Sequence, residues 1–355
     1  MDRFSYKAGA ARIEFGRGML SRTGEVMSDL GCKRAVVLAT EPQRQSAQDL
    51  ADALGPLAAG LYAGAVMHTP VDVTETALAY CREVKADCLI ALGGGSTTGL
   101  GKALAYRSDM TLIAVPTTYA GSEVTPILGQ TEKGLKTTLK DNRVLPSAVI
   151  YDPALSDTLP LGMSVVSGLN AMAHAAEALY AQDRNPVSSM LAVEGIAAMK
   201  SGLRRIADDP AAPAGRDSAL YGAWLCGTVL GQVGMALHHK ICHTLGGSFN
   251  MPHAETHAVM LPHTVGFNAR AVPDQLEPIS QIFGDEPGPG LFGYCKSLGA
   301  PTSLQQLGFR QADLDRAADI ASGNPYWNPR QIDRDGLRAM LQDAFDGAEP
   351  PRGGC

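Results

Sequence analysis

Four short runs in the first half of the chain are apolar throughout, and this pattern constrains the fold more than any other feature. They cover residues 35–38, 88–92, 112–115 and 148–151, and they are rich in Val, Ile, Leu and Ala. A strand with one wet face alternates apolar and polar side chains, so unbroken apolar runs indicate strands that are covered on both faces. The spacers are long enough for crossover helices. The sequence therefore predicts a parallel, doubly wound α/β sheet.

From about Ser164 the chain changes character, because Ala, Leu and Met recur at helical spacing and the strand signal is almost lost. The clearest helical segments are residues 171–181, 189–204 and 218–230. The stretch 152–162 is rich in helix and strand breakers and separates the two halves. The expected domains are an α/β dinucleotide-binding domain at 1–155, an α-helical substrate and catalytic domain at 156–347, and a flexible tail at 348–355.

Composition excludes several classes of protein. Of 355 residues, 45% are hydrophobic and 19% charged, which argues against a disordered chain, a coiled coil or a collagen-like fibre. The formal charge is −6 and no Lys or Arg run occurs, so nucleic acid is not an expected partner. No apolar run reaches the roughly 20 residues that cross a bilayer and no signal pattern opens the chain, so we expect no membrane partner and a cytoplasmic location. The seven cysteines never form CxxC, which indicates neither a disulfide framework nor a thiolate zinc site.

A glycine-rich turn follows the second apolar run. Residues 93–102 read GGGSTTGLGK and lead into a helix-compatible segment. Glycines let backbone amides approach an anion closely, and a helix start adds partial positive charge. Thr117, Thr118 and Ser122 follow the next strand, and both segments can reach one nucleotide because ligands bind at the carboxyl ends of parallel strands. A tight turn without a ligand is the alternative, since the spacing matches neither GxGxxG nor GxxxxGK[ST].

Histidines gather in the second half of the chain. Six of the eight lie between residues 238 and 263. Asn170 and His174 are four residues apart, as are His239 and His243, so each pair shares one helix face. His253 follows in a loop or at a new helix start. Imidazoles around one site can ligate a metal, bind an anionic substrate or shuttle a proton, and we interpret His174, His239, His243 and His253 in this way. The histidines interpreted as structural are His68, His257 and His263, with His238 left open.

These segments resemble the iron-containing alcohol dehydrogenase superfamily over nearly the whole chain and, within it, the maleylacetate reductase family. The superfamily turn GGGSxxDxxK is similar to residues 93–102, with Gly99 in place of the Asp, and PTTxxxxSE is similar to residues 116–123. The strings TTYAGSE at 117–123 and HHKICHTLGG at 238–247 are the more specific match to the reductases. The resemblance implies the dehydroquinate synthase-like fold, with a Rossmann-like N-terminal domain before an all-helical domain, and a homodimer.

The resemblance also bears on metal binding. The superfamily's metal ligands are one Asp and three His, which would map onto Asn170, His174, His239 and His253. Asn170 departs from that set, and the maleylacetate reductases share the change. An uncharged amide is a poor donor to a hard or borderline cation, so Fe²⁺ or Zn²⁺ should bind less tightly. We therefore predict that no metal is required.

The reaction that the resemblance implies is reduction of the C2=C3 double bond of maleylacetate by NADH or NADPH, giving 3-oxoadipate during breakdown of aromatic compounds. Hydride adds to the carbon β to the ketone, charge collects on the ketone oxygen, and a proton completes the α carbon. Histidines can supply both the oxyanion donor and the proton. The residues expected to be catalytic are His243 or His253 as the acid, together with His239 and His174. Those expected to bind substrate are Asn170, His174, His239 and Tyr119. Those expected to bind the cofactor are Gly93, Gly94, Gly95, Ser96, Thr97, Lys102, Thr117, Thr118, Ser122 and Thr40.

Thr40 bears on the choice of cofactor. NAD-selective dehydrogenases place an acidic residue after the second strand, and that position falls on Thr40 here. A neutral hydroxyl does not repel a 2′-phosphate, so we expect use of NADPH as well as NADH, provided that Glu41 points away. Three alternatives remain open: a metal-dependent alcohol dehydrogenase or aldehyde reductase in which Asn170 still coordinates, a dehydroquinate synthase-like lyase, and a nucleotide-binding module without activity.

Overall fold

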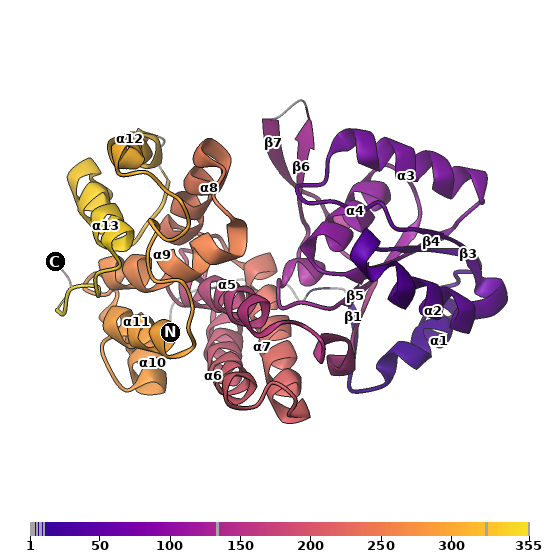
Figure 1. Ribbon diagram of the computed structural model, residues 1–355, viewed down its shortest axis with the longest axis horizontal. Coiled ribbons are helices and arrows are strands. Elements are labelled where there is room, and N and C mark those ends of the chain that lie inside the picture. The colour runs from indigo at the N-terminus through magenta and orange to yellow at the C-terminus, as the bar shows by residue number, and fades with distance from the viewer. Residues whose placement is uncertain are drawn as a thin grey trace. The chain divides into compact units, whose positions relative to one another are not determined.

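The computed structural model describes residues 11–132, 135–323 and 326–353, together with Phe4, Tyr6 and Gly9. The chain forms two compact units, of which the first ends at Leu159 and the second begins at Pro160. This division falls inside the breaker-rich stretch 152–162 and slightly after the expected boundary at residue 155. The two units are coloured indigo to magenta and magenta to yellow in Figure 1.

The first unit is built on a six-stranded sheet in the order β1-β8-β5-β4-β2-β3, in which every pair of neighbours is parallel. The strands are β1 (Arg12–Phe15), β2 (Ala35–Leu38), β3 (Ala58–Tyr62), β4 (Cys88–Gly93), β5 (Thr111–Pro116) and β8 (Ala148–Tyr151). The helices of this unit are α1 (Thr23–Asp29), α2 (Arg44–Leu54), α3 (Val71–Glu83) and α4 (Gly95–Tyr106). An antiparallel hairpin is formed by β6 (Ile127–Glu132) and β7 (Leu135–Lys140).

Alternate side chains of the central strands enter two different apolar cores. Val37 and Ile90 pack with residues of α1 and α2, whereas Val36 and Leu89 pack with residues of α3 and α4. Because both faces are covered, the strands need apolar residues at every position. This explains why all four predicted apolar runs are strands, and it confirms the predicted parallel α/β sheet. After β2 the chain adds β3 on one side and β4 on the other, so the direction of strand addition reverses between β2 and β4. Ligands of such sheets bind at the carboxyl ends of the strands at this switch point.

The second unit contains helices and no strand among its described residues, which confirms the predicted change of character. Its helices are α5 (Leu161–Tyr180), α6 (Pro186–Asp208), α7 (Pro213–Gln232), α8 (Leu237–Phe249), α9 (His253–Asn268), α10 (Pro273–Phe283), α11 (Pro287–Ser297), α12 (Leu314–Gly323) and α13 (Arg334–Asp346). α5 packs against α6, α7 and α9, and it is buried along most of its length. A helix surrounded in this way has little use for polar side chains, so those that it carries need a specific reason.

Residues 348–353 pack against the second unit, where the sequence predicts a flexible tail. Pro350 is buried, the Ala348 amide donates to the Asp343 carbonyl at 2.9 Å, and the Arg352 guanidinium pairs with the Asp285 carboxylate at 2.6 Å. These contacts hold the segment in place; residues 354–355 lie outside the described part. Among the described helices, none alone is long and apolar enough to cross a bilayer, and α7 with α8 passes that test only as a pair bent by 95°.

Candidate active site

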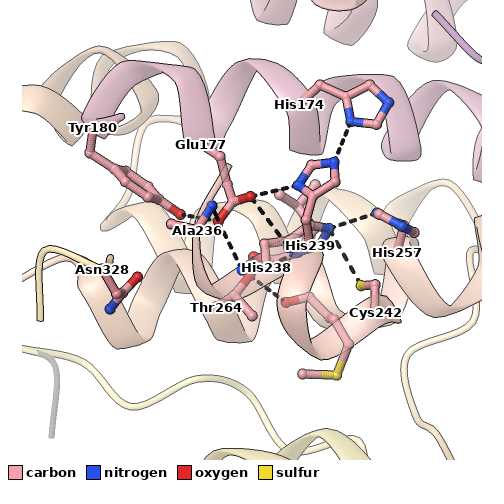
Figure 2. Close-up of polar contacts among 12 residues, drawn as sticks. His174, Glu177, Tyr180, Ala236, His238, His239, Cys242, His257, Thr264 and Asn328 are labelled. Atoms are coloured by element: carbon pink, nitrogen blue, oxygen red, sulfur yellow. Dashed lines mark hydrogen bonds and ion pairs between the residues drawn. The ribbon is translucent and has the colours of Figure 1, made fainter. Parts of the chain in front are cut away.

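The Glu177 carboxylate on α5 accepts hydrogen bonds from backbone amides at the start of α8. Its Oε1 accepts hydrogen bonds from the amides of Ala236 at 3.2 Å and His238 at 2.8 Å, and its Oε2 accepts from the His239 amide at 3.3 Å (Figure 2). The first amides of a helix have no partner within the helix, and the helix dipole favours a negative charge there. Glu177 therefore anchors α8 and fixes where His238 and His239 begin.

The same carboxylate also binds an imidazole. His239 Nδ1 lies 2.5 Å from Glu177 Oε2, and His239 Nε2 lies 2.9 Å from His174 Nδ1 (Figure 2). Burial alone would raise the pKa of the Glu177 carboxyl, but the hydrogen bond from His239, the nearby His charges and the His238 amide outweigh it, so the pKa is lowered. Glu177, His239 and His174 thus form one continuous chain that begins at an ionised carboxylate.

Five imidazoles contact one another around this chain. The ring centroids of His174 and His239 are 5.0 Å apart, and those of His239 and His243 are 6.0 Å apart. His257 lies 4.5 Å from His253 and 5.3 Å from His239 by the same measure. The structure therefore brings together all four histidines that the sequence singled out, and it adds His257 and the neighbouring His238 to them.

Exposure divides the cluster. His174 and His239 are buried, with 4% and 7% of their surface accessible, and Asn170 is buried on the same face of α5, one turn before His174. His243 and His253 are exposed, and His253 is the first residue of α9. The exposed pair can exchange protons with solvent, which suits an acid that must be recharged after each turnover. Asn170 Oδ1 is buried and accepts no hydrogen bond, so it can receive a donor from a bound molecule.

A second group of donors lies behind the first. His238, Cys242 and His257 are buried, and each offers one ligand atom within 4.8 Å of the others. His238 Nε2 is 2.9 Å from His257 Nδ1, and Cys242 Sγ is 3.7 Å from His238 Nε2. This trio is a candidate metal centre by type. Burial raises the pKa of the Cys242 thiol well above its usual range, however, and opposes the thiolate that a metal needs.

The sequence analysis did not single out Glu177, and it interpreted His257 as structural although its ring contacts the cluster. Glu177 lies three residues after His174 and seven after Asn170 on one face of an Ala-rich helix, and this spacing was available as a signal. His257 lies four residues after His253, and the two rings are neighbours on α9. A single histidine in an apolar helix usually has a structural role, which is why the spacing carried less weight.

In the first unit, one glutamine connects the turns that follow β2 and β5. Gln43 Nε2 donates to Thr117 Oγ1 at 2.8 Å, and Thr40 Oγ1 lies 3.2 Å from Gln43 Oε1. Gly93 has a φ of 153°, and a Cβ there would lie 2.4 Å from Thr97 Oγ1. Only glycine fits this position, because the backbone turns in the left-handed region against two side chains. Thr40, Gly93 and Thr117 therefore lie together at the point where ligands of doubly wound sheets bind.

The other residues of the glycine-rich turn follow Gly93 and begin α4. Gly94 and Gly95 lead into α4, and a Cβ on Gly94 would lie 3.0 Å from the Thr118 side chain. Ser96 is the second residue of α4, at the helix end that attracts anions. Tyr119 also belongs to this unit and is fully buried.

Lys102 differs from its predicted role. It is fully buried, and its Nζ donates to the carbonyls of Ser122, Thr125 and Ile127 at 2.6, 2.8 and 2.8 Å. Burial lowers the pKa of this ammonium to about 7, and the charge of Glu123 opposes the shift. The protein's own carbonyls occupy the donors, so Lys102 holds the loop that carries Ser122 instead of contacting a phosphate directly.

Gly99, where the superfamily has an Asp, is also explained. A Cβ at Gly99 would lie 2.4 Å from Thr69 Oγ1, so the threonine fills the space of the missing side chain. Thr69 has a φ of 47°, which is unusual for a β-branched residue. Where the superfamily has an Asp side chain, this chain thus has Gly99, and the side chain of Thr69 occupies the space beside it.

Fold and site together define an oxidoreductase with a dinucleotide-type sheet and a histidine-rich helical unit. The profile of the iron-containing alcohol dehydrogenase family matches residues 10–153, and that of its C-terminal domain matches residues 164–345. The chain belongs to this family. A maleylacetate reductase of Rhizobium sp. is 56% identical over 99% of this chain and 100% of its own, and one of Burkholderia cepacia is 48% identical over the same shares.

Solved structures agree with this assignment. The crystal structure of maleylacetate reductase from Agrobacterium tumefaciens has a TM-score of 0.97 and 55% identity, covering 99% of this chain and 100% of that one. An iron-containing alcohol dehydrogenase from Corynebacterium glutamicum has a TM-score of 0.94 and 38% identity, covering 99% of both chains. The predicted family and fold are confirmed.

Proposed function

We propose that this protein reduces the C2=C3 double bond of maleylacetate with NADH or NADPH, giving 3-oxoadipate. The observation that supports this most is a cluster of imidazoles backed by Glu177, with an amide at position 170, in a chain 56% identical to a maleylacetate reductase. The substrate carries two carboxylates and a ketone conjugated to the double bond. It therefore needs donors and positive charge in the site and no exposed carboxylate beside it.

The proposed reaction has two steps. The nicotinamide gives hydride to C2, the carbon β to the ketone. The π electrons of C2=C3 then form a C3=C4 double bond while those of the ketone move to its oxygen, which gives an enolate. A proton then adds to C3, and the ketone re-forms. One reduced nicotinamide and one proton are consumed for each molecule of product.

The chain from Glu177 to His174 supplies a donor for the enolate. With Glu177 ionised and His239 in its imidazolium form, His239 donates from Nδ1 to Glu177 and from Nε2 to His174 Nδ1, and His174 carries its own hydrogen on Nε2. A preorganised donor of this kind is worth about 3 kcal/mol in the transition state. The negative charge of Glu177 stabilises the His239 imidazolium without facing the substrate. His243 or His253, both exposed, then delivers the proton to C3.

The family name implies a metal ion, and the residues of this chain do not fit it. Asn170 offers a neutral amide where the superfamily has a carboxylate. His174 Nδ1 and His239 Nε2 lie 2.9 Å apart, and a hydrogen between them would keep these two atoms from both directing lone pairs at a cation. We therefore propose that turnover requires no bound metal, a proposal that rests on these two residues and on the identity of residue 170.

The direct experiment is an assay of exhaustively chelated protein with maleylacetate and NADH, monitored through the absorbance of the reduced nicotinamide. We expect NADH oxidation at a rate within about twofold of the untreated enzyme, with metal analysis showing well under one ion per chain. Tightly bound iron or zinc whose removal abolishes turnover would show instead a metal-dependent enzyme. A protein that releases product without net oxidation of NADH would be a lyase.

The cofactor choice gives a separate prediction. Glu41 forms two hydrogen bonds of 2.7 Å to Arg44, so its charge is neutralised beside Thr40. We expect kcat/KM for NADH to exceed that for NADPH by less than about a thousandfold, because residue 40 is a neutral threonine and the carboxylate of Glu41 is paired with Arg44. Steady-state kinetics with both cofactors measures this. A Thr40→Asp variant is the matched control, and it should lose NADPH activity while retaining NADH activity.

We also propose, from the family resemblance, that the chain forms a homodimer and that Tyr119 binds the substrate. The cytoplasmic location is an expectation from the sequence pattern.

A further inference from the structure

One glutamine of the first unit joins two hydroxyl groups at the switch point of the sheet, and the proposed reaction assigns it no role. Gln43 is the last residue of the short 3₁₀ helix η2 (Glu41–Gln43), which follows β2. Its Nε2 donates to Thr117 Oγ1 at 2.8 Å, and its Oε1 lies 3.2 Å from Thr40 Oγ1. Thr40 follows β2 and Thr117 follows β5, so this one side chain connects the carboxyl ends of two strands.

The glycine turn leaves room for the Gln43 amide. A Cβ on Gly93 would lie 2.7 Å from Gln43 Oε1, which is closer than such atoms approach in proteins. Thr117 is tied to the same turn, because its amide donates to the Gly93 carbonyl at 3.2 Å. Gln43 is half-buried and Thr117 is buried. Contacts on both sides therefore fix the direction of the Gln43 amide.

The direction of each hydrogen bond follows from which atoms carry hydrogens. Gln43 Oε1 carries none, so the hydrogen in its contact with Thr40 is that of the threonine hydroxyl. Thr40 is the N-cap residue of η2, but its side chain accepts no capping hydrogen bond there. Its oxygen therefore offers lone pairs, and no hydrogen, to a ligand. Thr117 is the opposite case, because it accepts from Gln43 and keeps its own hydrogen for a ligand.

We propose that Gln43 is a specificity-determining residue that favours NADH over NADPH, because it holds the hydroxyl hydrogen of Thr40 away from the cofactor. This inference rests on the proposed function, in which residue 40 lies beside the adenosine ribose. The free 2′-hydroxyl of NADH donates to Thr40 Oγ1. The 2′-phosphate of NADPH is largely dianionic at neutral pH, so its oxygens face only the lone pairs of Thr40. The difference of one hydrogen bond corresponds to about tenfold in affinity, well inside the thousandfold limit expected above.

Cofactor binding tests this without any dicarboxylate substrate. Titrations that follow the fluorescence of the reduced nicotinamide give Kd for NADH and for NADPH, and the native protein should bind NADH about tenfold more tightly. Gln43→Met has a similar length but no amide, so the Thr40 hydroxyl rotates freely and donates to a phosphate. We expect the ratio of the two Kd values to shift toward NADPH by about fivefold or more. Gln43→Ala should give the same shift and replaces Gln43→Met if the latter does not fold. An unchanged ratio, or a shift further toward NADH, would overturn the proposal.

A control and a double variant separate this role from a structural one. Gln45 is exposed on α2 and donates to Asp49 at 2.8 Å, so Gln45→Met should leave the ratio unchanged. Thr40→Val removes the hydroxyl through which Gln43 acts, so Gln43→Met should add no further shift on that background. A full shift in the double variant would overturn the proposal, because Gln43 would then act without Thr40. If the native protein binds NADH but does not reduce maleylacetate, the proposed function fails, while the Kd values still decide the role of Gln43.

Discussion

Replacement of Glu177 by Gln is expected to lower kcat by about a hundredfold at neutral pH, with little effect on KM for NADH. The amide has the same shape but no charge, and its nitrogen is a donor where the carboxylate accepts. In the native protein Oε2 accepts from His239 Nδ1 at 2.5 Å. With the amide nitrogen facing that ring, Nδ1 must become the acceptor, and the hydrogen moves to Nε2. The imidazolium form of His239 then loses its counter-charge.

The same substitution tests the role of Glu177 in the fold. Its carboxylate also accepts from the amides of His238 and His239 at the start of α8. Loss of charge at this buried helix end should lower the free energy of unfolding by about 1–3 kcal/mol, measured by urea denaturation. α8 carries both histidines, so activity must be measured on fully folded protein. The assays are therefore run without urea and well below the temperature at which the variant unfolds.

Tyr180→Phe provides the control for Glu177→Gln. The Tyr180 hydroxyl donates the longest of the hydrogen bonds that reach the Glu177 carboxylate, at 3.5 Å from Oε1. We expect kcat within about threefold of the native value, because the carboxylate keeps its charge and its short contacts. A Glu177→Gln enzyme that also stays within threefold would show that the carboxylate only anchors α8 and leaves the chemistry to other groups.

The sequence predicts the central strands and the helix faces well because both depend on local patterns. Strands covered on both faces have apolar runs, and β2, β4, β5 and β8 follow them. The edge strand β1 (RIEF) is half-buried and alternates charged with apolar residues, so it carries no such run. The half-buried edge strand β3 (AAGLY) is apolar, but the prediction did not assign it as a strand. α9 begins at His253, one of the two possibilities that the sequence left open.

Contacts between distant segments could not be predicted in the same way. Lys102 occupies a typical phosphate-binding position in sequence, but β6 and the preceding loop place three carbonyls around its ammonium. Glu177 gains its role from the amides of α8, some 60 residues later in the chain. A sequence pattern shows which side chains share a face, and it does not show which backbone groups a later helix brings to them.

Acidification is expected to destabilise the protein steeply between pH 6.5 and pH 4, and His263 alone should account for about 1.4 kcal/mol per pH unit. His263 is 2% exposed, and burial lowers its pKa to about 3. In the unfolded chain the same ring titrates near 6.5. Below that pH the unfolded state binds a proton that the native state does not. The stability that His263 contributes is therefore complete above pH 6.5 and is lost as the pH falls toward its folded pKa.

Chemical denaturation at several pH values measures this slope for the native protein and for His263→Gln. The variant removes one titrating ring, so its stability should depend less on pH by about 1.4 kcal/mol per unit between pH 6 and pH 4. His68 is exposed and has a φ of 67°, so His68→Asn, which suits that backbone, is the matched control for replacing a histidine outside the interior, and the loss of slope should be smaller than in His263→Gln. Equal slopes for His263→Gln and the native protein would mean that His263 takes up a proton in the folded state. The remaining acid sensitivity would then belong to His238 and His257, whose pKa values burial also lowers.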